Sequence, residues 1–480
     1  MAPGLLAGPS LDAAVFTLAA ERLVGGVLPY VGTWDHKPPG IYAVHAVAIA
    51  LVGWLGAWPA VWLATVTCVG GAAAFVAAAA RSVVGPRIAA IAGLAVAAAM
   101  SQFIVSLGGG LTEPIAVLPL AASFWRAATA GGAPLRWLAA GGLAALALVI
   151  SLPALAVVAA LIVLALRSPT PLRAVALGLT GAAIVALAVL GALAAGGILD
   201  DAVRNVIGYN AAYRAASAPA ASTGAAPQIA GVVLSFLFLI FPAALGLLAA
   251  RRRRPARTAA LASLAWLGTS VVLFAAQGRF ETHYAIPLAI PLAWLAAVGL
   301  DEAAGAWRRG GPARLLGAVP IGLAVVLSAA VISATAPAMV ASVTAENRRV
   351  DLIGAYIRDR SSAAATVFVW GNEPQIYLAA DRAPASPYVY LYPLTTPGYS
   401  SPQQVAEILA AWTVSPPAII IDAGSFTPGT PGDPPLLLDR PVASDGRDYD
   451  ALDPLRAFVR DRYALEVTLD GWPLYRRVGS

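Results

Sequence analysis

The sequence predicts an α-helical polytopic membrane protein with a small α/β domain at its C-terminus. Three observations carry this prediction: 59% of the 480 residues are hydrophobic, only 12% are charged, and the apolar residues form long runs. Soluble proteins are about one-quarter charged, so a chain this apolar must bury its surface in lipid. The mean hydropathy of +0.76 agrees with this assignment.

The apolar runs predict a bundle of about ten membrane helices over residues 59–340, since a spanning helix needs about 20 apolar residues. The runs lie at 59–80, 86–105, 112–128, 136–150, 152–167, 174–198, 228–249, 258–276, 284–300 and 315–338. The continuous stretch 136–167 is too long for one span. Its Ser151-Leu152-Pro153 sequence predicts a break, because proline interrupts a helix.

Arginines occupy every second gap between these runs and predict the orientation of the bundle. They are Arg81 and Arg87, Arg126 and Arg136, Arg167 and Arg173, Arg251–Arg254 with Arg257, and Arg308, Arg309 and Arg314. Cytoplasmic loops of membrane proteins carry the excess of basic residues. We therefore expect a multi-pass protein of the plasma membrane, with the alternate gaps outside: 1–58, 106–113, around 151, 199–227, 277–283 and 339–480.

Residues 1–58 are predicted to be the first external loop, with interfacial helices. The run Ile41–Gly56 is apolar but is shorter than the ~20 residues of a span, and counting it as one would break the arginine alternation. We interpret it as a helix along the outer interface, with His45 and the Trp54 region at headgroup depth.

Residues 345–480 are acidic in balance and predict a soluble extracytoplasmic α/β domain. Helices are expected at Val350–Arg358, Val405–Trp412 and Pro454–Tyr463. Strands are expected at Ala365–Trp370, Ala418–Ile421, Leu465–Leu469 and Pro473–Arg476. Proline and glycine between residues 423 and 435 predict a loop.

Composition and motifs exclude several classes of function. The basic residues lie between apolar runs rather than in a patch, which argues against nucleic-acid binding. The single cysteine, Cys68, allows no internal disulfide. No GxGxxG, Walker, HExxH or CxxC pattern is present, so a donor presented by lipid fits better than a nucleotide sugar. A divalent metal is left open, because no ligand cluster has the expected spacing.

Lys37 is the only lysine among the 31 basic residues. The chain otherwise uses arginine, so this lysine predicts a site that needs a compact ammonium, which donates to phosphate as a point charge. Pro38 and Pro39 stiffen the backbone that carries it. The alternative is a chance survivor of the composition bias.

Asp12 and Glu113 are the candidate catalytic carboxylates. Asp12 could take a proton from an acceptor hydroxyl as a general base, or could simply begin the helix predicted at Ala13–Val24. Glu113 stands at the mouth of the span 112–128. It could be a second carboxylate, a metal ligand, a partner of sugar hydroxyls or a helix cap, and ionisable groups at membrane depth are usually functional.

The other outward gaps contain further polar residues. Arg279 and His283 could hold a phosphate or diphosphate, although Arg279 could instead bind lipid headgroups. Structural or interfacial roles fit Asp35 and His45, and anchoring at the membrane surface fits Tyr209 and Tyr213.

Several of these segments resemble the GT-C glycosyltransferases, in the branch of the protein O-mannosyltransferases and the aminoarabinose transferase of lipid A. The resemblance covers most of the chain, and the most specific part is an upstream aspartate followed by Asp-His-Lys-Pro-Pro-Gly. The matching segments are Asp12, Gly25-Gly26, Pro29-Tyr30, Trp34–Tyr42, Leu111–Pro114, Gly278–Phe280 with His283-Tyr284 and Pro287, and Val367–Tyr377.

The resemblance implies a GT-C-like fold and a polyprenyl-phosphate-linked sugar donor, with a lipid, glycan or protein as acceptor. It places Asp12 and Glu113 as the catalytic acids and implies inversion by direct displacement. Contacts to the carrier phosphate or the substrate are expected from Asp35, His36, Lys37, Arg279, His283 and Tyr284.

This chain departs from the family pattern in three places. Relatives often have Asp-Glu where this chain has Asp12-Ala13, and a lysine where it has Ser151. Relatives also carry a spanning helix before the first carboxylate, whereas eleven residues precede Asp12, so we expect a truncated or misassigned start. The competing hypotheses are a transporter or lipid-carrier flippase, which should show paired broken helices, and a non-catalytic scaffold.

Overall fold

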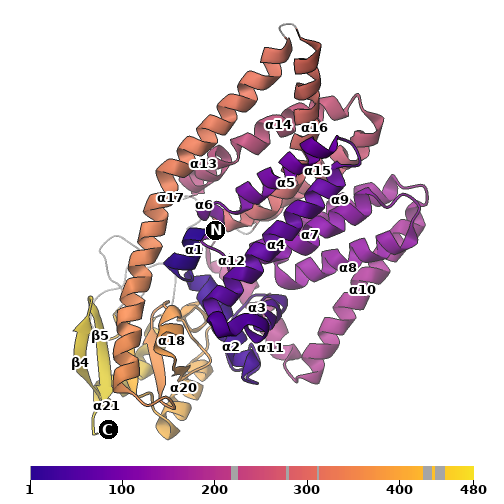
Figure 1. Cartoon of the computed structure of the whole chain (residues 1–480). Coiled ribbons are helices and arrows are strands. Elements are labelled where there is room, and N and C mark those ends of the chain that lie inside the picture. The colour runs from indigo at the N-terminus through magenta and orange to yellow at the C-terminus, as the bar shows by residue number, and fades with distance from the viewer. Residues whose placement is uncertain are drawn as a thin grey trace.

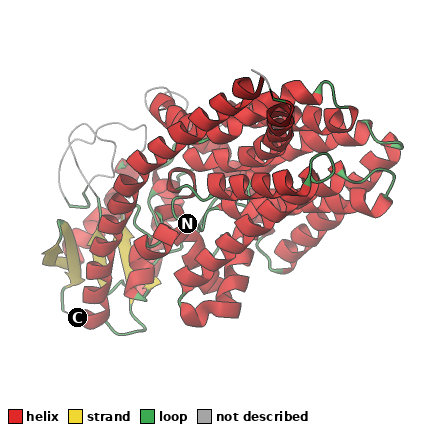
Figure 2. Cartoon of the chain, turned by 45° about the horizontal axis from the view of Figure 1, so that its top comes forward, coloured by secondary structure: helices red, strands yellow, loops and turns green. Residues whose placement is uncertain are grey.

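A computed structural model describes residues 2–217, 225–276, 281–310, 313–424, 435–437 and 449–479. Helices dominate the molecule, and the strands gather at one end beside the C-terminus (Figure 2). This arrangement confirms the predicted helical membrane protein with a small C-terminal sheet domain.

Each of the ten predicted apolar runs lies on helix. The elements are α4 (Ala57–Ala80), α5 (Pro86–Met100), α6 (Phe103–Ser106), α7 (Thr112–Ala128), α8 (Pro134–Ile150), η2 (Leu152–Ala156), α9 (Val157–Leu166), α10 (Pro171–Ala195), α13 (Ala225–Ser235), α14 (Leu237–Ala250), α15 (Arg254–Ala276), η4 (Thr282–Leu288), α16 (Ala289–Arg309) and α17 (Ala313–Arg360). Among the described residues, five helices are long and apolar enough to cross a membrane, or six if the bent pair α13–α14 is one span. The protein is therefore a multi-pass membrane protein, while the number of about ten spans stays a prediction.

Glycines let two pairs of helices approach closely. A Cβ atom added at Gly141 of α8 would lie 1.8 Å from the carbonyl oxygen of Gly178 in α10. A Cβ atom added at Gly246 of α14 would lie 1.9 Å from the carbonyl oxygen of Leu295 in α16. Small residues at such crossings are typical of helix packing in membranes. Lipid provides no hydrophobic driving force between helices, so their association depends on close van der Waals contact.

The predicted break in the stretch 136–167 is confirmed. Helix α8 ends at Ile150, and the 3₁₀ turn η2 carries Pro153 in its first turn before α9 begins. The break places Ser151 and its side chain between two helical segments, where it is fully buried.

The run 228–249 is not the single helix that the sequence predicts. Helices α13 and α14 meet at an angle of 70° around Phe236. Polar side chains satisfy the backbone at this bend: Ser328 of α17 donates to the Leu234 carbonyl and accepts from the Phe238 amide, both at 3.1 Å. Gln102 donates to the Ser235 carbonyl at 3.2 Å. Irregular backbone is tolerated inside a membrane protein where neighbouring groups complete its hydrogen bonds in this way.

Helix α17 has 48 residues and also corrects the sequence-based expectation. Residues Val350–Arg358 are its C-terminal end rather than a separate helix of the tail. The connecting residues 339–349 are rich in helix-forming alanine, methionine, glutamate and arginine and contain no glycine or proline, so nothing interrupts the helix there. It runs from the far end of the bundle to the strands (Figure 1).

Short helices surround the junction between the bundle and the sheet domain. They are α1 (Ala2–Ala7), α2 (Leu11–Val24), α3 (Gly40–Val52), η1 (Gly53–Leu55), α11 (Leu199–Val203), the π-helical turn η3 (Arg204–Tyr209) and α12 (Asn210–Ser217). Trp54 is 82% exposed, as an interfacial residue would be. His45, expected at headgroup depth, is fully buried against Phe16.

The C-terminal domain contains a mixed five-stranded sheet of order β2-β1-β3-β5-β4. Strand β1 (Thr366–Trp370) pairs in parallel with β2 (Ala383–Pro384) and with the central strand β3 (Ile419–Asp422). Strand β5 (Trp472–Arg477) is antiparallel to β3 and β4 (Tyr463–Leu469). The associated helices are α18 (Gln375–Ala380), α19 (Tyr392–Thr395), α20 (Pro402–Val414), η5 (Asp450–Leu452) and α21 (Asp453–Arg462).

This sheet confirms the four predicted strands and the helices near 405–412 and 454–463. Strand β2 and helices α18 and α19 are too short to give a periodic signal, and the sequence did not predict them. Most of the predicted loop 423–435 lies outside the described residues.

Candidate active site

A cavity of about 240 Å³, which we call the lysine cavity, opens where six separate parts of the chain meet. It receives side chains from the start of α2, the loop before α3, the turn after α6, α12, η4 with the residue before it, and the segment around α19. The lining residues are Ser10, Leu11, Asp12, Val15, Phe16, Asp35, His36, Lys37, Leu107, Tyr213, Glu281, His283, Tyr284, Tyr390 and Tyr392. Six of the eight predicted site residues are therefore in one place: Asp12, Asp35, His36, Lys37, His283 and Tyr284.

Hydrogen bonds fix the backbone of Lys37, and its side chain lines the cavity. The hydroxyls of Tyr30 and Tyr42 donate to the Lys37 carbonyl at 2.9 Å and 3.3 Å. Within the described residues, the ammonium itself forms no hydrogen bond or ion pair. A fixed backbone and a free cation are what an anion-binding lysine requires.

The groups around Lys37 keep it charged. Burial by itself would lower the pKa of this ammonium. Its neighbours more than compensate and raise the pKa above its usual value; they are Tyr284, Asp12, Glu113 and Asp35. The cavity therefore presents a permanent positive charge close to carboxylates.

Asp12 faces the lysine cavity from the first turn of α2. The helix begins at Leu11 and its N-cap is Ser10, so the alternative that Asp12 caps the helix is wrong. No hydrogen bond to the Asp12 carboxylate is found in the described part of the chain. An unoccupied carboxylate beside the cavity is free to accept a proton from a bound hydroxyl.

Asp35 and His36 form the wall of the cavity. Asp35 is 2% exposed and accepts hydrogen bonds from Tyr42 at 2.7 Å and Tyr390 at 3.0 Å. Its Oδ1 also lies 3.2 Å from Nδ1 of His36. Burial by itself would raise the pKa of Asp35, but the hydrogen bonds from His36 and Tyr42 hold this pKa below its usual value. Asp35 thus joins the first loop to the C-terminal domain, in agreement with its structural alternative.

Glu113 lies behind the cavity in a buried polar cluster. Its Oε1 accepts hydrogen bonds from Thr112 at 2.9 Å and Ser151 at 3.0 Å. Its Oε2 has no hydrogen-bond partner among the described residues and lies 3.9 Å from Nε2 of His283. Glu113 is in the first turn of α7, but its carboxylate bonds to side chains rather than capping the helix, and Ser151 binds it directly.

A turn with positive φ angles leads into helix α7 just before Glu113. Leu107, Gly108, Gly109 and Gly110 all have positive φ, between 45° and 119°, a region that glycine adopts at no steric cost. Thr65 Oγ1 accepts a hydrogen bond from the Gly110 amide at 3.1 Å and fixes the turn against α4. The three consecutive glycines are the sequence signal for this turn.

Three further residues that the sequence singled out are Arg279, Tyr209 and Tyr213. Arg279 lies outside the described residues. Tyr209 is fully buried between Trp34 and Tyr399, so its predicted role as a membrane-surface anchor is wrong. Tyr213 lines the lysine cavity instead of facing the membrane surface.

Sequence reasoning missed the contribution of the C-terminal domain. Tyr390 and Tyr392 line the lysine cavity, and the Tyr390 ring packs on Trp34 at a centroid distance of 5.6 Å. Their only sequence signal is a cluster of tyrosines at 388–399. Among the described residues, no group of three His, Cys, Asp or Glu side chains could hold a metal ion, and a metal stays a prediction.

No protein-family model and no curated protein matches this chain. Solved structures do. ArnT from Cupriavidus metallidurans bound to undecaprenyl phosphate is 16% identical, with a TM-score of 0.64 over 98% of this chain and 94% of that chain. Its apo state gives a TM-score of 0.62 at 16% identity over 98% and 93%. The oligosaccharyltransferase AglB from Archaeoglobus fulgidus, in complex with an inhibitory peptide and a dolichol-phosphate, gives 0.49 at 13% identity over 86% and 65%.

The likeness to ArnT extends over nearly the full length of both chains. It shows that this protein has the same fold as ArnT, as the resemblance of the segments around Asp12, Lys37 and Glu113 implied.

Proposed function

We propose that this protein is an integral membrane glycosyltransferase that moves a sugar from a polyprenyl-phosphate carrier to an acceptor outside the membrane. The observation that carries the proposal is the lysine cavity: the ammonium of the single lysine and the carboxylate of Asp12 both line it, and neither makes a hydrogen bond or close ion pair within the described residues. The fold shared with ArnT, which has been solved with undecaprenyl phosphate, supports the same class of carrier.

In the proposed reaction, the acceptor hydroxyl oxygen attacks the anomeric carbon of the donor sugar. The bond from that carbon to the carrier phosphate oxygen breaks, and its electron pair leaves with the phosphate. Asp12 accepts the proton of the hydroxyl as general base. The phosphate gains one negative charge, which the ammonium of Lys37 stabilises in a site partly shielded from water. Attack opposite to the leaving phosphate inverts the anomeric carbon.

Glu113 and His283 have a supporting role in this proposal. The Oε2 atom of Glu113 has no hydrogen-bond partner among the described residues and faces His283. The Glu113 side chain as a whole is 2% exposed. His283 lines the cavity from η4 and can contact sugar hydroxyls, while Glu113 lies behind it and can orient its imidazole. Arg279, four residues before His283, is proposed as a second contact to the carrier phosphate.

The arrangement of the chain supports an outward-facing site. The C-terminal end of α16, with Arg308 and Arg309, lies at the opposite end of the bundle from the sheet domain (Figure 1). If the arginines face the cytoplasm, as the positive-inside rule expects, the lysine cavity and the C-terminal domain lie outside.

The proposal is tested by replacing Lys37 in the full-length protein, purified into lipid nanodiscs. Lys37→Met should weaken binding of undecaprenyl phosphate and lower kcat/KM for sugar transfer by about 10²–10³-fold, because a charge that stabilises the leaving group is lost. Lys37→Arg keeps the charge and should retain part of both. Arg348→Met, which removes an exposed cation on α17, is the matched control. Unchanged carrier binding and transfer in Lys37→Met would overturn the proposal.

A lipid-carrier transporter is the second candidate, since the α13–α14 bend supplies one broken helix of the kind that transporters use. The polar groups at this bend are uncharged, whereas the charged groups gather in the lysine cavity. A transporter predicts carrier movement across the bilayer that does not depend on Asp12, and a transferase predicts sugar transfer that does.

A further inference from the structure

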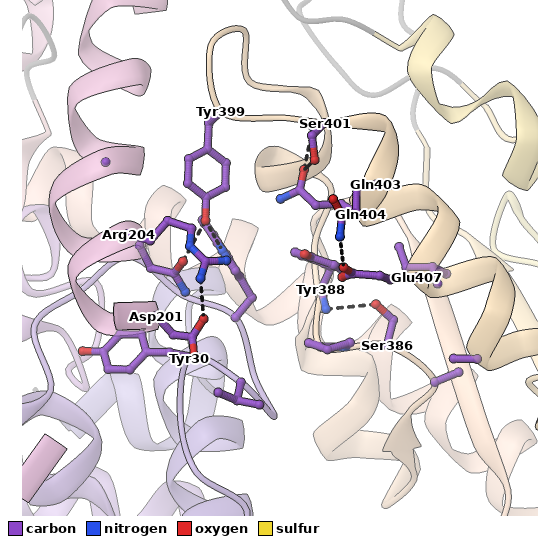
Figure 3. Close-up of a pocket in the computed structure, with 18 of the residues that line it drawn as sticks. Tyr30, Asp201, Arg204, Ser386, Tyr388, Tyr399, Ser401, Gln403, Gln404 and Glu407 are labelled. Atoms are coloured by element: carbon purple, nitrogen blue, oxygen red, sulfur yellow. Dashed lines mark hydrogen bonds and ion pairs between the residues drawn. The ribbon is translucent and has the colours of Figure 1, made fainter. Parts of the chain in front are cut away.

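A second and larger cavity, of about 780 Å³, lies between the membrane bundle and the C-terminal domain (Figure 3). We call it the interdomain cavity. One wall is formed by the first loop, α11 and η3, which contribute Tyr30, Asp201 and Arg204. The other comes from the segment 385–388 and from α20, where Gln403, Gln404 and Glu407 stand. Both parts of the protein are needed to form it.

The charges of this cavity are largely satisfied within the protein. Arg204 pairs with Asp201 at 3.0 Å, and Gln403 donates to Glu407 at 3.2 Å. Among the described lining residues the single cation is Arg204, which already has an acidic partner, so an anionic ligand gains little here. The lining instead combines tyrosine rings with amide and hydroxyl groups, which suits a ligand that has both apolar C–H faces and many hydroxyls.

One lining group has an unused donor in a rigid setting. Asn205 is 3% exposed and belongs to the π-helical turn η3, and such turns occur often at functional sites. Its Oδ1 accepts a hydrogen bond from Tyr399 at 2.7 Å, whose hydroxyl accepts one from the Trp34 indole at 2.8 Å. Its Nδ2 has no partner among the described residues.

A shared aromatic wall separates this cavity from the lysine cavity. Trp34 lines the interdomain cavity and Tyr390 lines the lysine cavity, and their rings are in contact with centroids 5.6 Å apart. Asp35 and Lys37 follow Trp34 within three residues of the chain. A ligand seated in the interdomain cavity is therefore separated from the lysine cavity by the Trp34 and Tyr390 rings.

We propose that the interdomain cavity is the acceptor site and that the acceptor is an uncharged glycan. This inference rests on the proposed transferase function and adds the class of its acceptor. The glycan is held by the tyrosine rings and the amides of α20, and one terminal hydroxyl reaches the lysine cavity. An anionic lipid or a peptide lacks the repeated hydroxyls that these groups recognise.

The test measures binding of uncharged oligosaccharides, namely malto-, manno- and chito-oligomers, to the full-length protein in nanodiscs. We expect at least one series to bind, and the double variant Gln403→Ala/Glu407→Ala to weaken that binding about tenfold, because two hydrogen-bonding groups are removed. Both side chains are exposed on α20, so the fold should be retained. Thr413→Ala, an exposed polar truncation on the same helix outside the cavity, is the matched control.

Binding of undecaprenyl phosphate is measured on the same samples and should be equal in the double variant and the control. The inference is overturned if no oligosaccharide binds, if only anionic glycans or peptides bind, or if the double variant binds as tightly as the control. Loss of carrier binding in Lys37→Met tests the transferase proposal separately, so the two can fail independently.

Discussion

The lysine cavity and the interdomain cavity share one aromatic wall, but they use their polar groups differently. In the lysine cavity, the ammonium of Lys37 and the carboxylate of Asp12 have no hydrogen-bond partner within the described part of the chain. In the interdomain cavity, Asp201 pairs with Arg204, and Glu407 accepts from Gln403.

This difference suits the lysine cavity to catalysis and the interdomain cavity to ligand binding. Leaving a charge unpaired costs free energy, and a protein tolerates that cost where charge must develop or a proton must move. Charges already paired contribute little to binding a new ion, so the second cavity is suited to recognising neutral groups. Variants in the wall, in the lysine cavity and outside both cavities test this difference.

The largest effect is expected from Asp12→Asn, which removes the proposed general base but keeps its shape. Sugar transfer should fall by about 10²–10⁴-fold, while binding of undecaprenyl phosphate and of oligosaccharide stays near that of the unmodified protein. Single-turnover transfer and equilibrium binding measure the two properties. A variant that transfers sugar at the normal rate would remove Asp12 from the mechanism.

Asp35→Asn should damage both cavities together, since Asp35 anchors the wall between them. Loss of the charge weakens the hydrogen bonds from Tyr42 and Tyr390, and the free energy of unfolding should fall by about 2 kcal/mol. Thermal unfolding in nanodiscs measures this change, with Tyr390→Phe as a milder comparison. Weakened transfer with unchanged stability would instead make Asp35 a direct substrate contact.

Ser151→Ala tests whether the cluster behind the lysine cavity positions Glu113. The variant removes one of two hydrogen bonds to Oε1, and kcat should fall about tenfold with little change in the KM for the donor. Ser151→Thr keeps the hydroxyl and should restore most of the rate. If Thr is no better than Ala, the serine acts through packing alone.

The smallest effect is expected from Ser328→Ala, which lines neither cavity. The α13–α14 bend loses two hydrogen bonds, and single interhelical hydrogen bonds in membranes contribute about 0.6 kcal/mol on average. Unfolding in mixed micelles should register this loss, with the exposed Ser333→Ala on the same helix as control. Altered oligosaccharide binding in Ser328→Ala would show that the bend is coupled to the acceptor site.

Much of the fold follows from composition, because lipid demands long apolar helices and the runs could be read directly. The break at Ser151 was predictable, since proline marks it. The bend at Phe236 was not, because the groups that stabilise it, Gln102 and Ser328, are far away in the sequence. Similarly, nothing local distinguishes a helix that ends at the membrane surface from α17, which continues to Arg360.

The candidate site was predictable where a residue type is rare or a motif is specific, as with Lys37 and Asp12. It was not predictable where residues act through distant partners. Trp34 and Tyr390 are separated by more than 350 positions, yet their contact forms the wall between the cavities. Asp35 was assigned to both substrate binding and structure, and only its three partners favour the structural role.

The continuous helix α17 sets a fixed height for the C-terminal domain. Its 48 residues make a rod of roughly 72 Å, more than twice the ~30 Å hydrocarbon layer. In the proposed arrangement, the length of α17 fixes the distance between the membrane bundle and the part of the C-terminal domain that would hold the acceptor. Inserting a single helical turn into α17 would move the interdomain cavity by about 5.4 Å. The acceptor hydroxyl would then no longer reach the donor sugar.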